Sequence, residues 1–340
     1  MGALESYLPD VFFLILGLVL FLYWVTDGFN LGLGIYSLAI RSEQDRGLII
    51  HSIARTWYAG QIWLIVLGGG LFGSFPVVYR VVSSALCIPV MLMLAGLAVR
   101  GVAIKFYDVS PNRRRWGLAF GLGSLVATLT QGFLLGGLLG GLPVAEGQFA
   151  GGYEDWLNPL STLIAATGAA GFVLMGMTYL IMKAEEPLRE RSIQAAVMAA
   201  WAFGCGLVLI LFWISLQHYE GHYSLLSLKQ GHYLYFALPL FLIEFVMLLR
   251  SLKKAEQDKP FQWSVLLFLT LAVGLASALY PSIMPPALTI FDAAAPAQSL
   301  LFLLVVSVVL LPVMLAYNAW LYRLFGGRVR EGARAENGQN

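Results

Sequence analysis

The sequence has few charged residues and almost no cysteine. Of its 340 residues only 12% are charged, about half the roughly 25% of a typical soluble domain. The two cysteines, Cys87 and Cys205, lie within apolar runs, so no disulfide framework is expected. No Cys-x-x-Cys pair, phosphate-binding glycine loop or nucleophile motif occurs. The net charge of +2 predicts no nucleic-acid partner. These shortages exclude a water-soluble enzyme and a disulfide-stapled secreted domain.

Long apolar stretches make up most of the chain instead. Hydrophobic residues account for 59% of the sequence, and the mean hydropathy is +0.77. Nine stretches are long enough to cross a bilayer: about 8–40, 48–72, 77–104, 116–143, 159–182, 193–217, 232–249, 262–284 and 298–322. We therefore predict an all-α integral membrane protein of about nine transmembrane helices. It would form one domain over residues 1–325, and the polar segment 326–340 would be a disordered cytoplasmic tail.

The basic residues predict the orientation. Most Lys and Arg residues fall in alternate connections and in the tail, whereas the opposite side holds only Arg80 and Lys229. Because basic residues concentrate on the cytoplasmic side, the N-terminus is predicted outside and the C-terminus in the cytoplasm. The first stretch is preceded by Glu5 and no basic residue, so we expect it to remain as a helix rather than to be cleaved as a signal peptide.

Four ionisable residues fall within the predicted spans: Asp27, Arg55, Arg100 and Glu244. Such side chains are costly in lipid unless they face protein, water or a partner. One hypothesis is that Asp27 pairs with Arg55 or Arg100 in a polar cluster near the inner face. The alternative is that both arginines reach the headgroups separately and Asp27 bonds only to backbone.

The first span also places Asp27 and Asn30 on one helix face, with Gly28 and Gly32 beside them. A carboxylate and an amide on one face could relay protons. The small residues equally favour a tight helix crossing in which the polar groups satisfy one another. Asp27, Asn30 and Glu244 are the proton-path candidates.

Aromatic, amide and glycine residues mark the second and fourth spans. Trp57 and Gln61 share one face of the second span, and Trp63 lies on another. These rings could border a quinone, but helix packing is the favoured interpretation. Gln131 precedes a glycine-rich run in the fourth span. The glycines of both spans predict close backbone contact with another helix.

The histidines predict no haem or metal site in this chain. His51 and His232 come nearest to the membrane interior but lie on opposite sides, so they cannot ligate one haem. His218 and His222 lie four residues apart around Glu220, which could be a metal pair, although a solvated loop is the favoured interpretation.

Several motifs, in this order, resemble subunit II of the cytochrome bd-type quinol oxidases. They are Thr26-Asp27-Gly28-Phe29-Asn30-Leu31-Gly32, Trp57 to Trp63-Leu64, Gly68-Gly69-Gly70-Leu71-Phe72, Phe75-Pro76-Val77-Val78-Tyr79 and Leu97-Ala98-Val99-Arg100-Gly101-Val102. The resemblance is densest over about residues 20–108. Thr130-Gln131-Gly132 is similar to the cyanide-insensitive branch of that family.

The resemblance implies a haem-free subunit of a heterodimeric oxidase in the bacterial cytoplasmic membrane. The complex would oxidise quinol and reduce dioxygen to water. Haems b and d and the quinol site would belong to subunit I, so this chain would contain no catalytic residue and bind no cofactor alone. Small accessory subunits, membrane lipid and quinone are further expected partners.

The sequence departs from the family pattern at two carboxylates. Relatives usually have Trp-Asp-Gly-Asn where this chain has Trp57, Tyr58, Ala59 and Gly60, and their Asp-Gly-Phe-Asp motif ends here in Asn30. The resemblance therefore transfers Asp27 as a proton-path candidate. Trp57, Tyr58, Gln61, Trp63, Arg100 and Gln131 are assigned as motif or structural positions. Two alternatives stay open: a secondary transporter with Asp27 as its ion-coupling carboxylate, and a purely structural scaffold.

Overall fold

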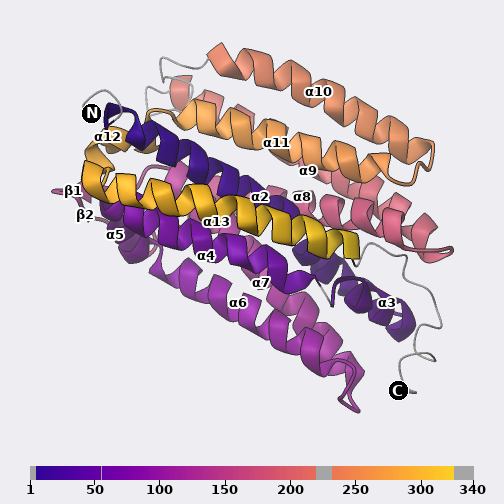
Figure 1. Ribbon diagram of the computed structural model, residues 1–340. Helices are drawn as coiled ribbons and strands as arrows, with labels where there is room; N and C mark the ends of the chain where they lie inside the picture. The colour runs from indigo at the N-terminus through magenta and orange to yellow at the C-terminus, as the bar shows by residue number, and fades with distance from the viewer. Residues whose placement is uncertain (1–4, 55, 220–231, 325–340) are drawn as a thin grey trace.

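The computed structural model describes residues 5–54, 56–219 and 232–324, and these form a bundle of long helices (Figure 1). In chain order the elements are α2 (Leu8–Ser37), α3 (Glu43–Ile53), α4 (Trp57–Ser74), α5 (Pro76–Ala85), α6 (Cys87–Phe106), α7 (Arg113–Leu139), β1 (Val144–Ala145), β2 (Gln148–Phe149), α8 (Pro159–Lys183), α9 (Leu188–Tyr219), α10 (His232–Lys253), α11 (Lys259–Leu279), β3 (Ser282–Met284), β4 (Leu288–Thr289), α12 (Ile290–Ala293) and α13 (Ala297–Leu324).

Among the described residues, seven helices are long and apolar enough to cross a membrane: α2, α6, α7, α8, α9, α11 and α13. These seven helices confirm the prediction of an all-α membrane protein, but not the predicted number of nine spans. Helices α4 and α10 occupy the positions of the second and seventh predicted spans. Tyr58, Gln61 and several glycines interrupt the apolar sequence of α4.

The second predicted span, 48–72, is divided in the structure. Its first part belongs to α3, a short helix whose N-cap Ser42 accepts a hydrogen bond from the Asp45 amide at 3.2 Å. This helix ends at Ile53, and α4 begins at Trp57. The polar residues of α3 favour a separate helix at the end of the bundle. Arg55 and the tail 326–340 lie outside the described residues.

The third predicted span, 77–104, is also divided, at Leu86 between α5 and α6. Helix α5 is amphipathic: it buries Val78, Val81 and Ala85, and it exposes Arg80. Hydropathy alone merges the two helices because apolar residues continue through the break. The fourth and eighth predicted spans end earlier than expected, since the last turn of α7 is at Leu139 and that of α11 at Leu279.

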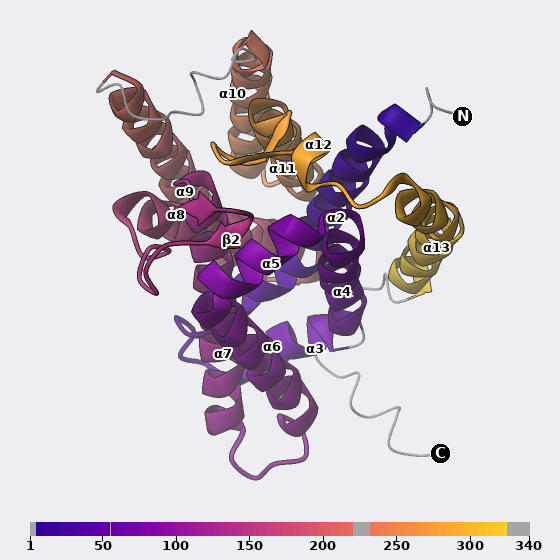
Figure 2. The same ribbon diagram turned by 90° about the vertical axis from the view of Figure 1, so that its left-hand side faces the viewer.

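Helix α2 packs against α4, α7, α8 and α11, so it is the central helix of the bundle (Figure 2). Helix α10 lies at one edge against α11, and α6 and α7 lie together at the opposite edge. Glycines bring several of these helices into backbone contact. A Cβ on Gly32 would lie 1.7 Å from the Phe172 carbonyl oxygen of α8, and one on Gly96 would lie 2.8 Å from the Gly123 carbonyl oxygen of α7.

Two β-hairpins and α12 lie in the connections at one end of the bundle. The Tyr280 hydroxyl donates a hydrogen bond to Asp10 at 2.8 Å, which ties the end of α11 to the start of α2. Thr289 and Asp292 form a capping box at α12. Hydrogen bonds from the Thr289 hydroxyl and amide hold the pKa of Asp292 below its usual value. These contacts fix the loops against the helix ends.

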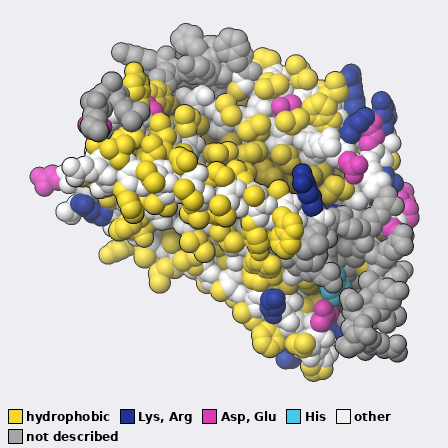
Figure 3. All heavy atoms as spheres, viewed as in Figure 1, with side chains coloured by type: hydrophobic (Ala, Val, Ile, Leu, Met, Phe, Trp, Pro, Cys, Tyr) yellow, Lys and Arg dark blue, Asp and Glu magenta, His cyan; other side chains and the backbone are white. Residues whose placement is uncertain are grey.

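The outer surface carries a broad apolar band. Figure 3 shows hydrophobic side chains over the middle of one face and most of its Lys and Arg side chains toward one end. On α13 the side chains of Phe302, Val305 and Trp320 are mostly exposed. Such a surface matches a hydrocarbon environment rather than water.

Candidate functional site: a buried ion pair beside an apolar cavity

Asp27 of α2 and Arg100 of α6 form an ion pair inside the bundle. Arg100 Nη2 donates to Asp27 Oδ1 at 2.8 Å and lies 2.9 Å from Oδ2. Both side chains have no exposed surface. Of the two arginines considered as partners of Asp27, Arg100 contacts it, and the guanidinium does not extend to the molecular surface.

Small residues enclose this pair. Gly60 of α4 faces Asp27 so closely that a Cβ would lie 2.8 Å from the Asp27 Cβ. A Cβ on Gly123 of α7 would lie 2.9 Å from the Arg100 amide nitrogen, and one on Gly101 would lie 2.8 Å from the Trp57 ring. The four helices α2, α4, α6 and α7 therefore exclude lipid from the charges.

Asn30 extends the polar cluster along α2. Its Nδ2 donates to the Thr26 carbonyl oxygen at 2.9 Å and lies 3.4 Å from Asp27 Oδ1. The Tyr322 hydroxyl of α13 also reaches the Thr26 carbonyl, at 3.3 Å. Asp27 thus accepts hydrogen bonds from α6 and from its own helix, and α13 contacts the backbone of the preceding residue.

The tryptophans and Tyr58 of α4 face different surroundings. Trp63 is fully buried and packs beside Val19 and Tyr23 of α2. Trp57 covers Gly101, next to Arg100. Gln61 is half-buried, and Tyr58 is exposed at the α13 side. The structure thus brings Trp57 next to the ion pair, buries Trp63 against α2 and leaves Tyr58 at the surface.

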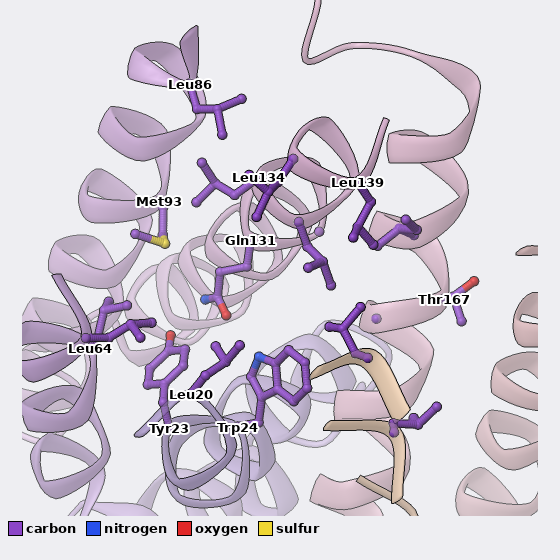
Figure 4. Close-up of a pocket in the computed structure, with 18 of the residues that line it drawn as sticks. Leu20, Tyr23, Trp24, Leu64, Leu86, Met93, Gln131, Leu134, Leu139 and Thr167 are labelled. Carbon is purple, nitrogen blue, oxygen red and sulfur yellow. The ribbon is translucent and has the colours of Figure 1, made fainter. Parts of the chain in front are cut away.

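A cavity of about 430 Å³ lies among α2, α4, α5, α6, α7, α8, α9 and α11, and its wall includes Tyr23, one helical turn from Asp27. Its walls are almost entirely apolar, with Leu, Val, Met and Phe side chains. The polar exceptions are Tyr23, Gln131 and Thr167. Figure 4 shows the Gln131 amide and the Tyr23 hydroxyl close together at one side of the cavity, with the amide pointing toward the hydroxyl. The cavity therefore combines an apolar volume with one polar wall.

Glu244 lies apart from this site, in the outer pair α10 and α11. The Thr270 hydroxyl donates to Glu244 Oε1 at 2.9 Å, and Oε2 is buried without a hydrogen-bond partner. The structure does not bring Glu244 into contact with Asp27.

We predict that Glu244→Gln keeps the thermal stability of the protein, because the amide oxygen can still accept from Thr270. Glu244→Leu removes that bond between helices and should cost about 1 kcal/mol. Melting temperatures of the purified protein check this. An equal loss in both variants would show that the carboxylate itself, rather than the hydrogen bond to Thr270, stabilises the pair of helices.

The described residues contain no group of three or more His, Cys, Asp or Glu side chains that could hold a metal ion. His51 lies on α3, where its Nε2 is 2.8 Å from Asp108 Oδ2, within hydrogen-bond distance. The backbone of His218 lies in the last turn of α9, so the predicted loop assignment is wrong for this residue. The side chains of His218 and His232, and all of His222, lie outside the described part of the chain, so the loop assignment of His222 stays a prediction.

Sequence reasoning missed Tyr23 and Tyr322. Tyr23 precedes Asp27 by one helical turn and therefore shares its face, a spacing that could have revealed it. Tyr322 is distant in sequence, and nothing in its local pattern indicates that it contacts α2. Its position depends on how α13 packs against the central helix.

The fold and site define a polytopic membrane protein with a buried ion pair and an internal apolar cavity. Comparison with known proteins identifies the class. The family described as "Cytochrome bd terminal oxidase subunit II" matches residues 8–325. The chain belongs to this family. It is accordingly a multi-pass protein of the bacterial inner membrane and a subunit of a respiratory quinol oxidase complex.

Individual relatives agree along nearly the whole chain. Cytochrome bd-I ubiquinol oxidase subunit 2 of Escherichia coli (strain K12) is 29% identical, with 94% of each chain covered. Cytochrome bd ubiquinol oxidase subunit 2 of Bacillus subtilis (strain 168) is 25% identical over 95% of this chain and 97% of that protein. A chain in the structure of bd oxidase from Geobacillus thermodenitrificans has the same fold, with a TM-score of 0.77, 21% identity and coverage of 94% and 98%.

Proposed function

We propose that this chain is the haem-free subunit of an oxidase that oxidises quinol and reduces dioxygen to water. The family match over residues 8–325 carries the proposal. Haems b and d are expected in subunit I, against which this chain packs. The transporter alternative gains no support, because the relatives reported above are oxidase subunits.

The proposed topology has nine spans, with the N-terminus outside and the C-terminus in the cytoplasm. Helices α4 and α10 would be the spans that complete the seven long apolar helices. Support comes from the basic residues, which gather toward one end of the face in Figure 3. Asp27 and Arg100 would then lie in the cytoplasmic half of the membrane.

The cavity is the proposed place for an apolar chain of quinone or lipid. Its walls match such a chain, because Leu, Val, Met and Phe side chains line most of it. Most glycines of α7 are not available for contact with a partner, because Gly132 and Gly136 pack against Ala165 and Ser161 of α8. On α4, by contrast, Gly68 and Gly69 face open space. We propose that this α4 surface faces a partner subunit or lipid.

The further role proposed for this subunit is to shape a proton entry from the cytoplasm, with Asp27 as its central residue and Asn30 beside it. Asp27→Asn is expected to slow oxygen consumption severalfold and to leave the haem content of the purified complex unchanged. The reason is that the asparagine amide cannot take up and release a proton as the Asp27 carboxylate can.

A double variant separates proton transfer from structural support, since Asp27→Asn also leaves Arg100 without a counter-charge. Asp27→Asn combined with Arg100→Gln removes both charges and retains a polar side chain at each position. Turnover should stay slow in this double variant, in which neither charge is left unpaired. Normal turnover in the double variant would refute the proton role of Asp27. A purely structural role of this subunit would then remain. Glu244→Gln, assayed in the same way, tests the second carboxylate.

A further inference from the structure

Buried polar atoms without hydrogen-bond partners concentrate around the Asp27–Arg100 pair. On α2, α4, α6 and α7 they are the Tyr23 hydroxyl, Asn30 Oδ1, Trp57 Nε1, Trp63 Nε1, Arg100 Nε and Nη1, Thr128 Oγ1, and both amide atoms of Gln131. Elsewhere in the described chain only isolated atoms of Trp156, Glu244 and Asn318 have this property. Within the described chain, the unpaired polar atoms therefore cluster around the Asp27–Arg100 pair.

Such a cluster would lower the stability of the protein if no water or other ligand bonded to these atoms. A buried donor or acceptor without a partner costs about 1–3 kcal/mol, and more when the group is charged. Most buried polar groups in proteins are therefore bonded to protein or to ordered water. Arg100 is the clearest case, because its guanidinium is fully buried and only Nη2 is bonded.

The region also has room for a ligand. Tyr23 and Gln131 line the cavity of about 430 Å³, far more than the roughly 10–15 Å³ that one water needs by the same kind of measure. The Tyr23 hydroxyl lies near both the Gln131 amide and the Asp27 carboxylate, but it meets the geometry of a hydrogen bond with neither. A bridging molecule would complete these contacts.

We propose that water molecules bind between the Gln131–Tyr23 wall of the cavity and the Asp27–Arg100 pair. Both kinds of partner are present: Arg100 Nη1 donates, and Gln131 Oε1 accepts. An anion is disfavoured because Asp27 already balances the charge of Arg100. This internal water site is independent of whether Asp27 carries protons during turnover.

Radiolytic hydroxyl-radical labelling of the purified, membrane-reconstituted complex tests the site, with mass spectrometry as the readout. Radicals formed from bound water modify the side chains beside it, even in the interior. Tyr23 should be labelled several-fold faster than Tyr179, a residue of the same type. Tyr179 is a stringent control because it is 5% exposed against 1% for Tyr23. Its ring stacks on Phe29 and packs edge-on against Phe261.

Variants of α7 give a second readout. Gln131→Leu removes the polar wall and should reduce Tyr23 labelling to the level of Tyr179. Thr130→Val is the matched control, since the Thr130 hydroxyl bonds only to the Val126 and Ala127 carbonyls of its own helix, and labelling should persist. Equal labelling of Tyr23 and Tyr179 in the unmodified complex would overturn the proposal, as would undiminished labelling in Gln131→Leu.

Discussion

Arg100→Leu should prevent stable accumulation of the chain in the membrane. The substitution leaves the Asp27 carboxylate fully buried without its charge partner. Breaking a buried pair from one side costs about 3–5 kcal/mol, a large share of the stability of most proteins. The quantity to measure is the amount of chain in the membrane fraction, together with the melting temperature of any complex that can be purified.

Replacing both charges should restore most of that loss. When a buried pair is replaced by apolar residues of similar volume, the change is often neutral or stabilising. We therefore expect Asp27→Leu combined with Arg100→Met to accumulate far better than Arg100→Leu alone. If the double variant were as depleted as the single one, the loss would come from packing around Arg100 and not from an unpaired charge.

Gly32→Val should disrupt the bundle more than a substitution at any other glycine of α2. A Cβ there would lie 1.7 Å from the Phe172 carbonyl oxygen and 2.8 Å from the Val173 amide nitrogen, so α2 and α8 would have to move apart. Backbone atoms cannot yield as a flexible side chain can. Overpacking typically costs about 1–3 kcal/mol, and we expect the upper end or beyond because backbone is displaced. Loss of the folded complex on detergent extraction is the measurement.

Gly17 of the same helix is the matched control. A Cβ on Gly17 would meet no atom within 4 Å. Gly17→Ala should therefore be neutral or stabilise the protein by up to about 1 kcal/mol, because alanine favours the helix. Comparable damage from Gly17→Ala would indicate that glycine flexibility in α2, rather than the contact with α8, is what the fold requires.

The sequence predicted the helices better than their interruptions. Hydropathy located the apolar segments, and the seven long helices lie where spans were expected. It could not separate α3 from α4 or α5 from α6, because a break of a few residues barely changes an average over a whole span. The start of α3 follows instead from local capping by Ser42, which acts on a single turn.

For the site, the sequence identified the charged residues but not their pairing. Asp27, Arg55 and Arg100 were all found from the cost of burying charge in lipid. Which arginine faces Asp27 depends on how α6 packs against α7 through Gly96 and Gly123, and no local pattern encodes that contact. The polar wall of the cavity was missed for the same reason, since Tyr23 and Gln131 meet only in the folded bundle.

The central claim is that this chain is an unpigmented subunit that supports a haem-carrying partner. The most direct test is the optical absorption spectrum of the purified chain, expressed alone and together with subunit I. The chain alone should show no haem absorption bands, and the co-expressed complex should show the bands of haems b and d. Haem bands in the chain purified alone, lost on substitution of one of its histidines, would contradict the account.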